Sequence, residues 1–124
     1  RILMISPIQF GPALEGMDPS YQHQWFLTDK SGVQLSANAC KALSGLDLKV
    51  KLGNLQVRAS GMLMLELILD VIEDDDSFRL VATDLQKQPL AAINEGELAA
   101  TWFEHIVGQP CLLLKRDPGH PDRA

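Results

Sequence analysis

Residues 94–115 read NEGELAATWFEHIVGQPCLLLK. Six apolar side chains in this stretch recur at the spacing i, i+1, i+4, i+5, i+8 and i+9, which gathers them on one face of an α-helix. They are Leu98, Ala99, Trp102, Phe103, Ile106 and Val107. The stretch therefore predicts one amphipathic helix near the C-terminal end, with Trp102 and Phe103 turned into a core.

The two ends of this helix are also marked in the sequence. Asn94 is a preferred N-cap residue, and Glu97 stands three positions later, as in a capping box. Gly108 favours the left-handed backbone that ends helices, and Pro110 cannot continue one. We therefore expect a capped helix that is followed by a short apolar strand at Cys111–Lys115.

Upstream of the helix, the pattern of apolar residues is typical of β-strands. Trp25–Thr28 and Val33–Ser36 are expected strands, joined by the turn Asp29–Gly32, whose glycine supplies a positive φ. Neighbouring residues of a strand point to opposite faces of the sheet. We therefore expect Trp25 and Phe26 on different faces, with at least one of them in the core.

Three further segments complete the expected strands. Residues 46–52 and 55–59 alternate between apolar and polar around a two-residue turn at Gly53–Asn54, which predicts a second hairpin. Residues 62–72 have a composition that fits either a helix or a strand, and we expect a strand. After the acidic run 73–76, which is typical of a solvated turn, residues 78–83 alternate again.

These segments define a fold class. Ile2–Ile5 is a short apolar run ended by Pro7, which suits a first buried strand. Together the segments predict a mainly β fold, a small, partly open β-barrel of about six to eight mostly antiparallel strands with one α-helix near the C-terminus. We expect one domain over residues 1–116 and a disordered tail or linker over residues 117–124, which offer little apolar surface to bury.

Composition excludes several classes of function. The formal net charge is −5 and no cluster of Lys and Arg offsets it, so we expect no nucleic-acid partner. The longest apolar run is too short to span a bilayer and the start lacks a signal-peptide pattern, so we expect no membrane partner and a cytoplasmic location. Residue 1 is Arg, which leaves open whether the natural protein is longer, and the oligomeric state is also open.

The sequence contains no complete catalytic set. Its histidines, His23, His105 and His120, stand in no recognisable motif, and there is no phosphate-binding loop and no zinc ligand quartet. We expect Cys40 and Cys111 to be reduced and buried, with a disulfide between them as the alternative. We therefore expect neither a catalytic residue nor a metal ligand in this chain.

Seven pieces of the chain, taken in order, match the pattern of a known family. They are Ser6–Ile8, Trp25–Gly32, Leu35–Ser36, Ala59–Met62, Leu65–Glu66, Gly96–Trp102 and Gly108–Leu113. Through them nearly the whole chain resembles the N-terminal β-barrel domain that precedes the MOSC domain in molybdenum-cofactor sulfurase C-terminal regions and related reductases. The resemblance implies a noncatalytic accessory barrel that helps shape a cofactor or substrate cleft with a MOSC domain, in cis or in trans.

The resemblance also indicates candidate cofactor-facing residues by family position. Gln9 stands where the family has Lys, and His23 stands where it has the Arg that precedes the Trp. Ser36 and Asn38 stand where it has Thr and a second Arg after the next strand. In the family, those Lys and Arg residues look suited to charge-assisted hydrogen bonds with the phosphate and pterin of the cofactor.

What the resemblance implies about the cofactor is limited by these replacements. It implies no cofactor held by this chain alone, and molybdenum cofactor only through a downstream MOSC domain, whose own cysteine is the ligand. Cys40 and Cys111 therefore do not inherit that role. The alternative function is a standalone protein-interaction or small-ligand-binding barrel that has lost the cofactor role. A hydrolase that uses His23 as its base rests on that single histidine.

Overall fold

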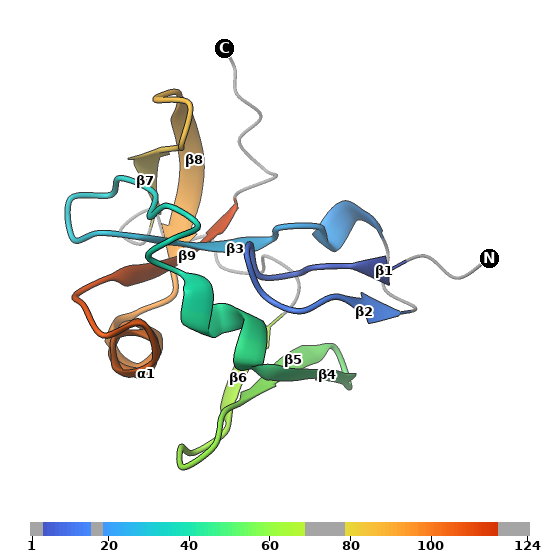
Figure 1. The fold of residues 1–124 in the computed structure, drawn as a ribbon. Coiled ribbons are helices and arrows are strands. Elements are labelled where there is room, and N and C mark those ends of the chain that lie inside the picture. Colours follow the sequence, from blue (N-terminus) through green and yellow to red (C-terminus); the bar gives the residue numbers. More distant parts are fainter. Residues whose placement is uncertain (1–3, 16–18, 69–78, 117–124) are drawn as a thin grey trace.

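The computed structural model describes residues 4–15, 19–68 and 79–116. In this part of the chain it has nine β-strands in three antiparallel sheets and one α-helix near the C-terminal end (Figure 1). Two of the nine strands are only two residues long. The strands form no closed barrel, so the expected mainly β, partly open arrangement is confirmed.

The sheets differ in size. A two-stranded pair joins β1 (Met4–Ile5) to β2 (Leu14–Glu15). The four-stranded sheet has the order β3 (Trp25–Thr28), β9 (Leu112–Arg116), β8 (Pro89–Asn94) and β7 (Arg79–Thr83). The three-stranded sheet has the order β4 (Asp47–Lys51), β5 (Asn54–Arg58) and β6 (Leu65–Ile68). The helices are the 3-10 helices η1 (Pro19–Tyr21) and η2 (Lys41–Gly45) and the α-helix α1 (Glu97–Val107).

The core lies on both faces of β3 and β9. Trp25 belongs to the larger apolar cluster, together with Phe103 of α1, while Phe26 belongs to a smaller cluster with Leu114. Both aromatic side chains of β3 are almost fully buried. The expectation that Trp25 and Phe26 point to opposite faces is confirmed, and it makes β3 a central element rather than a surface strand.

Two segments cover the edge of β3 that β9 leaves free. Ile8 forms a parallel bridge with Trp25, and Gln34 forms an antiparallel bridge with Thr28. The expected strand Val33–Ser36 is therefore wrong, because only isolated bridges form there. The segment divides its backbone hydrogen bonds between two strands: the Gln34 amide donates to the Thr83 carbonyl of β7 at 2.8 Å, and the Leu35 amide donates to the Leu27 carbonyl of β3 at 2.9 Å.

The β4–β5 hairpin forms as expected, but its turn lies one residue earlier than the sequence predicts. Leu52 and Gly53 are the two turn residues, with φ values of 53° and 81°, and Asn54 already belongs to β5. Two consecutive positive φ values are the signature of a type I′ turn, which matches the twist of a two-stranded ribbon. The apolar alternation had placed Leu52 in the strand, whereas its side chain is 92% exposed.

The ambiguous segment 62–72 is a strand only in part, because residues 65–68 form one whereas residues 62–64, which the structure also describes, do not. Leu65–Ile68 forms β6, and Leu65 and Leu67 are buried while the residues between and after them are exposed. Residues 69–72, the acidic run 73–76 and the tail 117–124 lie outside the described residues. Among the described residues, no helix is long and apolar enough to cross a membrane.

The strand β8 was not predicted from the sequence. Its central residues Ala91 and Ala92 have low β-propensity, and it begins at Pro89, so no alternation marks it. It is nevertheless paired on both sides, with β7 and with β9. Tertiary pairing therefore decides the structure of this segment.

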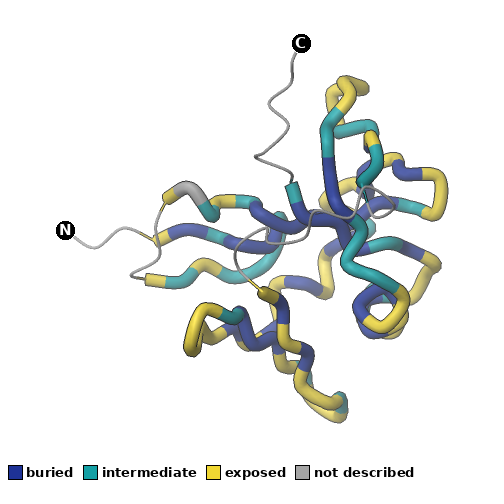
Figure 2. Tube along the Cα trace, turned by 180° about the vertical axis from the view of Figure 1, so that it is seen from behind, coloured by how far each residue is buried: buried dark blue, intermediate teal, exposed yellow. Residues whose placement is uncertain are grey.

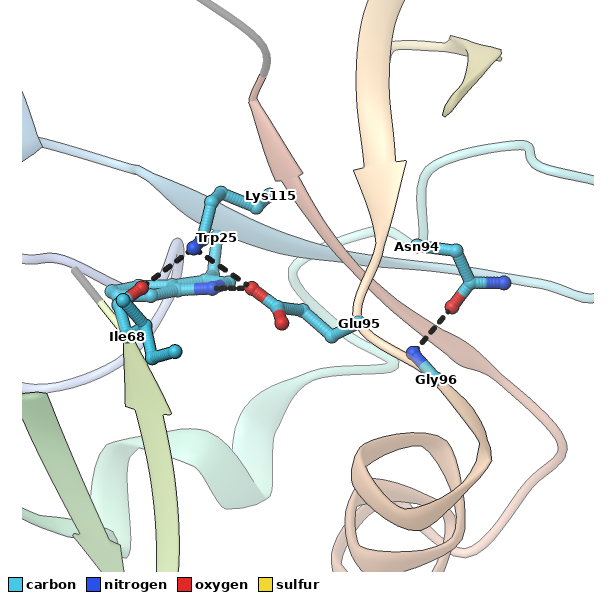
Figure 3. Close-up of polar contacts among 6 residues, drawn as sticks. All are labelled: Trp25, Ile68, Asn94, Glu95, Gly96 and Lys115. Carbon is cyan, nitrogen blue, oxygen red and sulfur yellow. Dashed lines mark hydrogen bonds and ion pairs between the residues drawn. The ribbon is translucent and has the colours of Figure 1, made fainter. Parts of the chain in front are cut away.

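The start of α1 also differs from the expectation. Asn94 still pairs with Leu114 as the last residue of β8, so its backbone cannot serve as the N-cap, and Gly96 takes that position. The Asn94 side chain instead accepts a hydrogen bond from the Gly96 amide at 2.9 Å (Figure 3). The C-terminal prediction is confirmed, since Gly108 adopts the left-handed conformation and donates its amide to the Glu104 carbonyl.

Three of the six residues of the expected apolar stripe of α1 are buried, and Ile106 and Val107 are partly buried against the same core, so the helix has both buried and exposed positions (Figure 2). Ala99, Trp102 and Phe103 lie in the core, and the rings of Trp102 and Phe103 meet edge to face at 5.0 Å. The helix packs against β9 and η2. Leu98 is the exception, because its side chain is 78% exposed, so its assignment to the buried stripe is wrong.

The strained turn position generates a prediction. Leu52→Asn places the residue type that type I′ turns favour before Gly53, so we expect the free energy of unfolding to rise by about 0.5–1 kcal/mol. Denaturant unfolding measures it. Leu63→Asn is the matched control, because Leu63 is 87% exposed but is not among the residues with positive φ. Equal stability of the two variants would contradict the assignment of strain to Leu52.

Candidate functional site

The most notable polar feature of the described chain is a charged cluster inside the larger apolar core. Lys115 on β9 lies directly opposite Trp25 on β3 in the sheet register, and its residue exposure is only 5%. Glu95 follows β8, and its amide donates to the Leu113 carbonyl at 3.0 Å, which keeps it beside β9. The ammonium on β9, the carboxylate that follows β8 and the indole on β3 thus lie close together.

The contacts in this cluster are short and directed (Figure 3). Lys115 Nζ lies 3.4 Å from Glu95 Oε2, and the same carboxylate oxygen accepts a hydrogen bond from Trp25 Nε1 at 2.7 Å. Lys115 Nζ also donates to the Ile68 carbonyl at 2.6 Å. Its distance to the centroid of the Trp25 ring is 5.5 Å, within the range of a cation–π contact.

This cluster joins the two larger sheets. Ile68 is the last residue of β6 in the three-stranded sheet, whereas Lys115, Glu95 and Trp25 belong to the four-stranded sheet and its continuation. A second side chain makes a similar link from α1, because Trp102 Nε1 donates to the Leu63 carbonyl at 2.7 Å. Side-chain donors therefore connect these elements, since Lys115 links β9 to β6 and Trp102 links α1 to the β5–β6 connection.

The charges in the cluster are suited to a structural role. A buried ammonium is costly unless a carboxylate and further hydrogen-bond acceptors compensate it. Here Glu95 and the Ile68 carbonyl supply both, and the carboxylate is in turn held by Trp25. Because cation and carboxylate are committed to each other, neither is presented to a substrate as a free acid, base or nucleophile.

A second polar group lies at the start of β3, around His23. The His23 backbone is left-handed, with φ 55°, and its ring contacts the Gln22 side chain at 3.3 Å. The side-chain carbonyl of Gln22 accepts the Ser6 amide at 2.8 Å. Arg116 at the end of β9 donates to the backbone carbonyls of both Gln22 and His23. The arrangement fastens the start of β3 to the end of β9.

The electrostatics at His23 favour a neutral ring. Partial burial lowers the pKa of His23 from 6.5, and the positive charge of Arg116 lowers it further. Burial also lowers the pKa of Arg116 itself, which stays a cation at neutral pH. Within the described residues, no Ser, Thr or Cys side chain is hydrogen-bonded to His23. The ring therefore has no nucleophile to activate.

The remaining residues indicated by family position lie apart from His23. Gln9 accepts a hydrogen bond from the Gln34 side chain, whose oxygen accepts the Leu85 amide at 3.2 Å. These contacts fasten the two segments that cover the edge of β3. Ser36 and Asn38 are exposed in the following turn, where the Ser36 hydroxyl accepts the Ala39 amide at 3.4 Å. In the part of the chain that is described, no hydrogen bond joins any two of the four candidates.

Both cysteines are free and buried in the larger core cluster, as expected. Burial raises the pKa of the Cys40 thiol to about 11 and is the main cause of the same rise, to about 11, at Cys111. Both thiols are therefore protonated and unreactive at neutral pH. Among the residues described, no group of three or more His, Cys, Asp or Glu side chains could hold a metal ion.

Sequence reasoning did not single out the cluster of Lys115 and Glu95. Lys115 closes an apolar run, where a lysine is most simply read as the solvated end of a strand. Glu95 lies just before the helix, where a carboxylate is most simply explained by the positive end of the helix dipole. Only the register, which pairs Lys115 with both Trp25 and Ile93, shows that the position is central.

The buried pair generates a prediction of stability. Lys115→Met leaves the Glu95 carboxylate without its cation, and we expect the free energy of unfolding to fall by about 2–3 kcal/mol, somewhat less than for a fully buried pair because Glu95 is partly exposed. The double variant with Glu95→Gln should recover part of the loss. Chemical denaturation measures both.

The control for this prediction is a surface pair. Lys30→Met breaks the Lys30–Glu104 ion pair, whose nitrogen and oxygen lie 2.8 Å apart at the surface, and should lower the free energy of unfolding much less than Lys115→Met does, because water screens the pair. If Lys115→Met proved no more costly than Lys30→Met, the structural role of the buried cluster would be refuted.

The environment of His23 generates a prediction of pH dependence. Because the folded pKa lies below 6.5, the unfolded chain takes up this proton first as the pH falls, so His23 contributes a loss of stability on acidification below that value. An NMR titration of the ring should give a pKa below 6.5, which rises in Arg116→Gln but not in Arg116→Lys. A pKa at or above 6.5 in the native chain would contradict this geometry.

Comparison with known proteins gives one informative relative. No family model matches the chain, and no curated protein matches it. The solution structure of a Bordetella bronchiseptica protein, a structural genomics target, matches with 33% sequence identity and a TM-score of 0.69, covering 87% of this chain and 85% of that one. At this identity and coverage, the chain belongs to the same family as that Bordetella protein.

Proposed function

We propose that the chain is a noncatalytic accessory β domain of a MOSC-type, molybdenum-cofactor-associated protein, which helps to shape a cofactor or substrate cleft against a MOSC domain in cis or in trans. One observation carries the noncatalytic part of the proposal. The ionisable groups inside the fold contribute to its stability. The Lys115 ammonium contacts the Glu95 carboxylate and the Ile68 carbonyl, and the Arg116 guanidinium donates to the backbone carbonyls of Gln22 and His23.

The positions of the family-like pieces support the kinship. The pieces Trp25–Gly32 and Gly108–Leu113 contain all of β3 and the first part of β9, which pair with each other. The piece Gly96–Trp102 begins α1, which packs on β9. These three pieces thus contact one another, and each contributes side chains to the larger core cluster.

The four candidate positions do not fit a grip on the cofactor itself. Gln9, Ser36 and Asn38 are uncharged, and the lowered pKa of His23 keeps it neutral at pH 7. A phosphate would find no charge-assisted hydrogen bond at these side chains. We therefore assign them a role in shaping the surface that faces the partner domain, and we assign the molybdenum cofactor to that domain.

A cytoplasmic location is part of the proposal. Two free thiols buried in the core are typical of proteins kept in a reducing compartment.

A second candidate function has an observation of its own. The match to the Bordetella chain spans most of that chain, which leaves little length there for a further folded domain. This favours a standalone interaction or small-ligand-binding barrel that has kept the fold and lost the cofactor role. The two candidates differ in whether a MOSC domain binds the chain.

Titration of the isotope-labelled full chain with a MOSC domain encoded in the same genome tests the proposal. We expect the NMR signals of Gln9, His23, Ser36 and Asn38 to shift. Asn38→Trp, which adds bulk at an exposed turn, should weaken binding about tenfold. Gln86→Trp, in the exposed β7–β8 turn, is the matched control and should leave binding unchanged.

Two results would count against the accessory role. A MOSC domain that causes no shift anywhere would favour the standalone candidate. If the MOSC domain shifted the NMR signals of Asn38→Trp as strongly as those of the wild type, the contact would lie elsewhere on the chain.

A further inference from the structure

Three polar groups before β3 form a chain of hydrogen bonds whose direction is fixed at one end. The Ser6 amide, which directly follows β1, donates to the side-chain oxygen of Gln22 at 2.8 Å. A backbone amide can only donate, so the Gln22 side chain presents its oxygen to Ser6 and has only its NH2 group left for another contact. That NH2 group lies 3.3 Å from His23 Nε2. The direction of the first bond therefore determines the direction of the second.

This chain of bonds assigns the proton of the His23 ring. Because Gln22 Nε2 can only donate, His23 Nε2 must accept and carries no proton. A neutral imidazole then holds its single proton on Nδ1. Partial burial lowers the pKa of His23, and the Arg116 cation on β9 lowers it further, so both favour the neutral ring. Among the described residues, Arg116 is the charged group that acts on this pKa, and no carboxylate opposes it.

The backbone around the ring is held in place, whereas the Gln22 side chain can respond to a change in the ring. Arg116 donates to the backbone carbonyls of Gln22 and His23, and the His23 amide donates to the Ser6 carbonyl at 2.7 Å. Gln22 itself is exposed, so its side-chain amide can rotate without displacing the core. A change in the His23 ring therefore reaches Ser6 through the Gln22 side chain.

We propose that His23 and Gln22 form a proton-dependent latch on the Ser6 amide. A proton taken up from water at His23 Nε2 turns that atom from an acceptor into a donor, which then faces the NH2 group of Gln22, a second donor. Rotation of the Gln22 amide brings its oxygen to the ring and its NH2 group to the Ser6 amide, so the hydrogen bond to Ser6 is lost.

The latch controls how firmly the end of β1 is fastened to the residues before β3. With the ring neutral, Ser6 is held by its amide and by its carbonyl. With the ring protonated, only the bond from the His23 amide to the Ser6 carbonyl remains. The proposal goes beyond the accessory role, because the latch responds to acid and needs no partner domain.

NMR of the isotope-labelled full chain tests the latch. At neutral pH the nitrogen shifts of the His23 ring should show a proton on Nδ1 and none on Nε2. When the pH falls below the pKa of His23, the protection factor of the Ser6 amide against hydrogen exchange should fall about five- to tenfold, as expected for the loss of one hydrogen bond. The Trp25 amide, which donates to the Pro7 carbonyl at 2.9 Å, is the internal reference and should keep its protection.

Two variants separate the latch from a general effect of acid. Gln22→Glu supplies two oxygens, which accept from the Ser6 amide and from the protonated ring at the same time, so Ser6 should stay protected at both pH values. His23→Asn tolerates the positive φ of 55° and keeps an oxygen that can accept from Gln22, but it takes up no proton. In this variant too, the protection of Ser6 should not depend on pH.

Three results would overturn the proposal. The first is a His23 ring whose proton lies on Nε2 at neutral pH. The second is a Ser6 amide whose protection does not change as His23 titrates. The third is an equal loss of Ser6 protection in acid in the wild type, Gln22→Glu and His23→Asn.

Discussion

The ammonium of Lys115, buried where the two larger sheets meet, is the constraint on which the rest of the structure depends. It reaches the Ile68 carbonyl from β9, so it supplies across the gap the hydrogen bond that a paired strand would supply in a closed barrel. A cation in that place requires an anion, and Glu95 can serve only because β8 ends beside β9. Trp25 then orients the carboxylate. The buried charge therefore supplies a hydrogen bond between two sheets that do not pair through their backbones.

The same constraint determines what the fold can offer to function. Lys115 and the two thiols are buried, Glu95 is partly buried, and these groups are paired or protonated. The exposed side chains of the described residues include charged ones such as Lys49 and Glu97, neutral ones such as Ser36 and Asn38, and apolar ones such as Leu98. Our proposal that the domain acts through surfaces presented to other domains is based on this arrangement.

Local patterns predicted those parts of the fold that local forces decide. The strand Trp25–Thr28, the second hairpin and the C-terminal stop of α1 follow from alternation and from glycine at a positive φ. Two further errors lie where tertiary pairing prevails. Asn94 is held in β8, and the alanine-rich β8 is fixed by neighbours on both sides. The cluster at Lys115 could not be predicted, because it depends on a register between strands far apart in sequence.

The central claim is that Lys115 couples the two sheets into one cooperative unit. Native-state hydrogen exchange tests this most directly, by comparing the opening free energies of amides in β6 with those in β9. Coupled sheets predict that the most protected amides of both strands open together, at the free energy of global unfolding. If β6 opened separately, at a clearly lower free energy than β9, the buried cation would not be what joins the sheets.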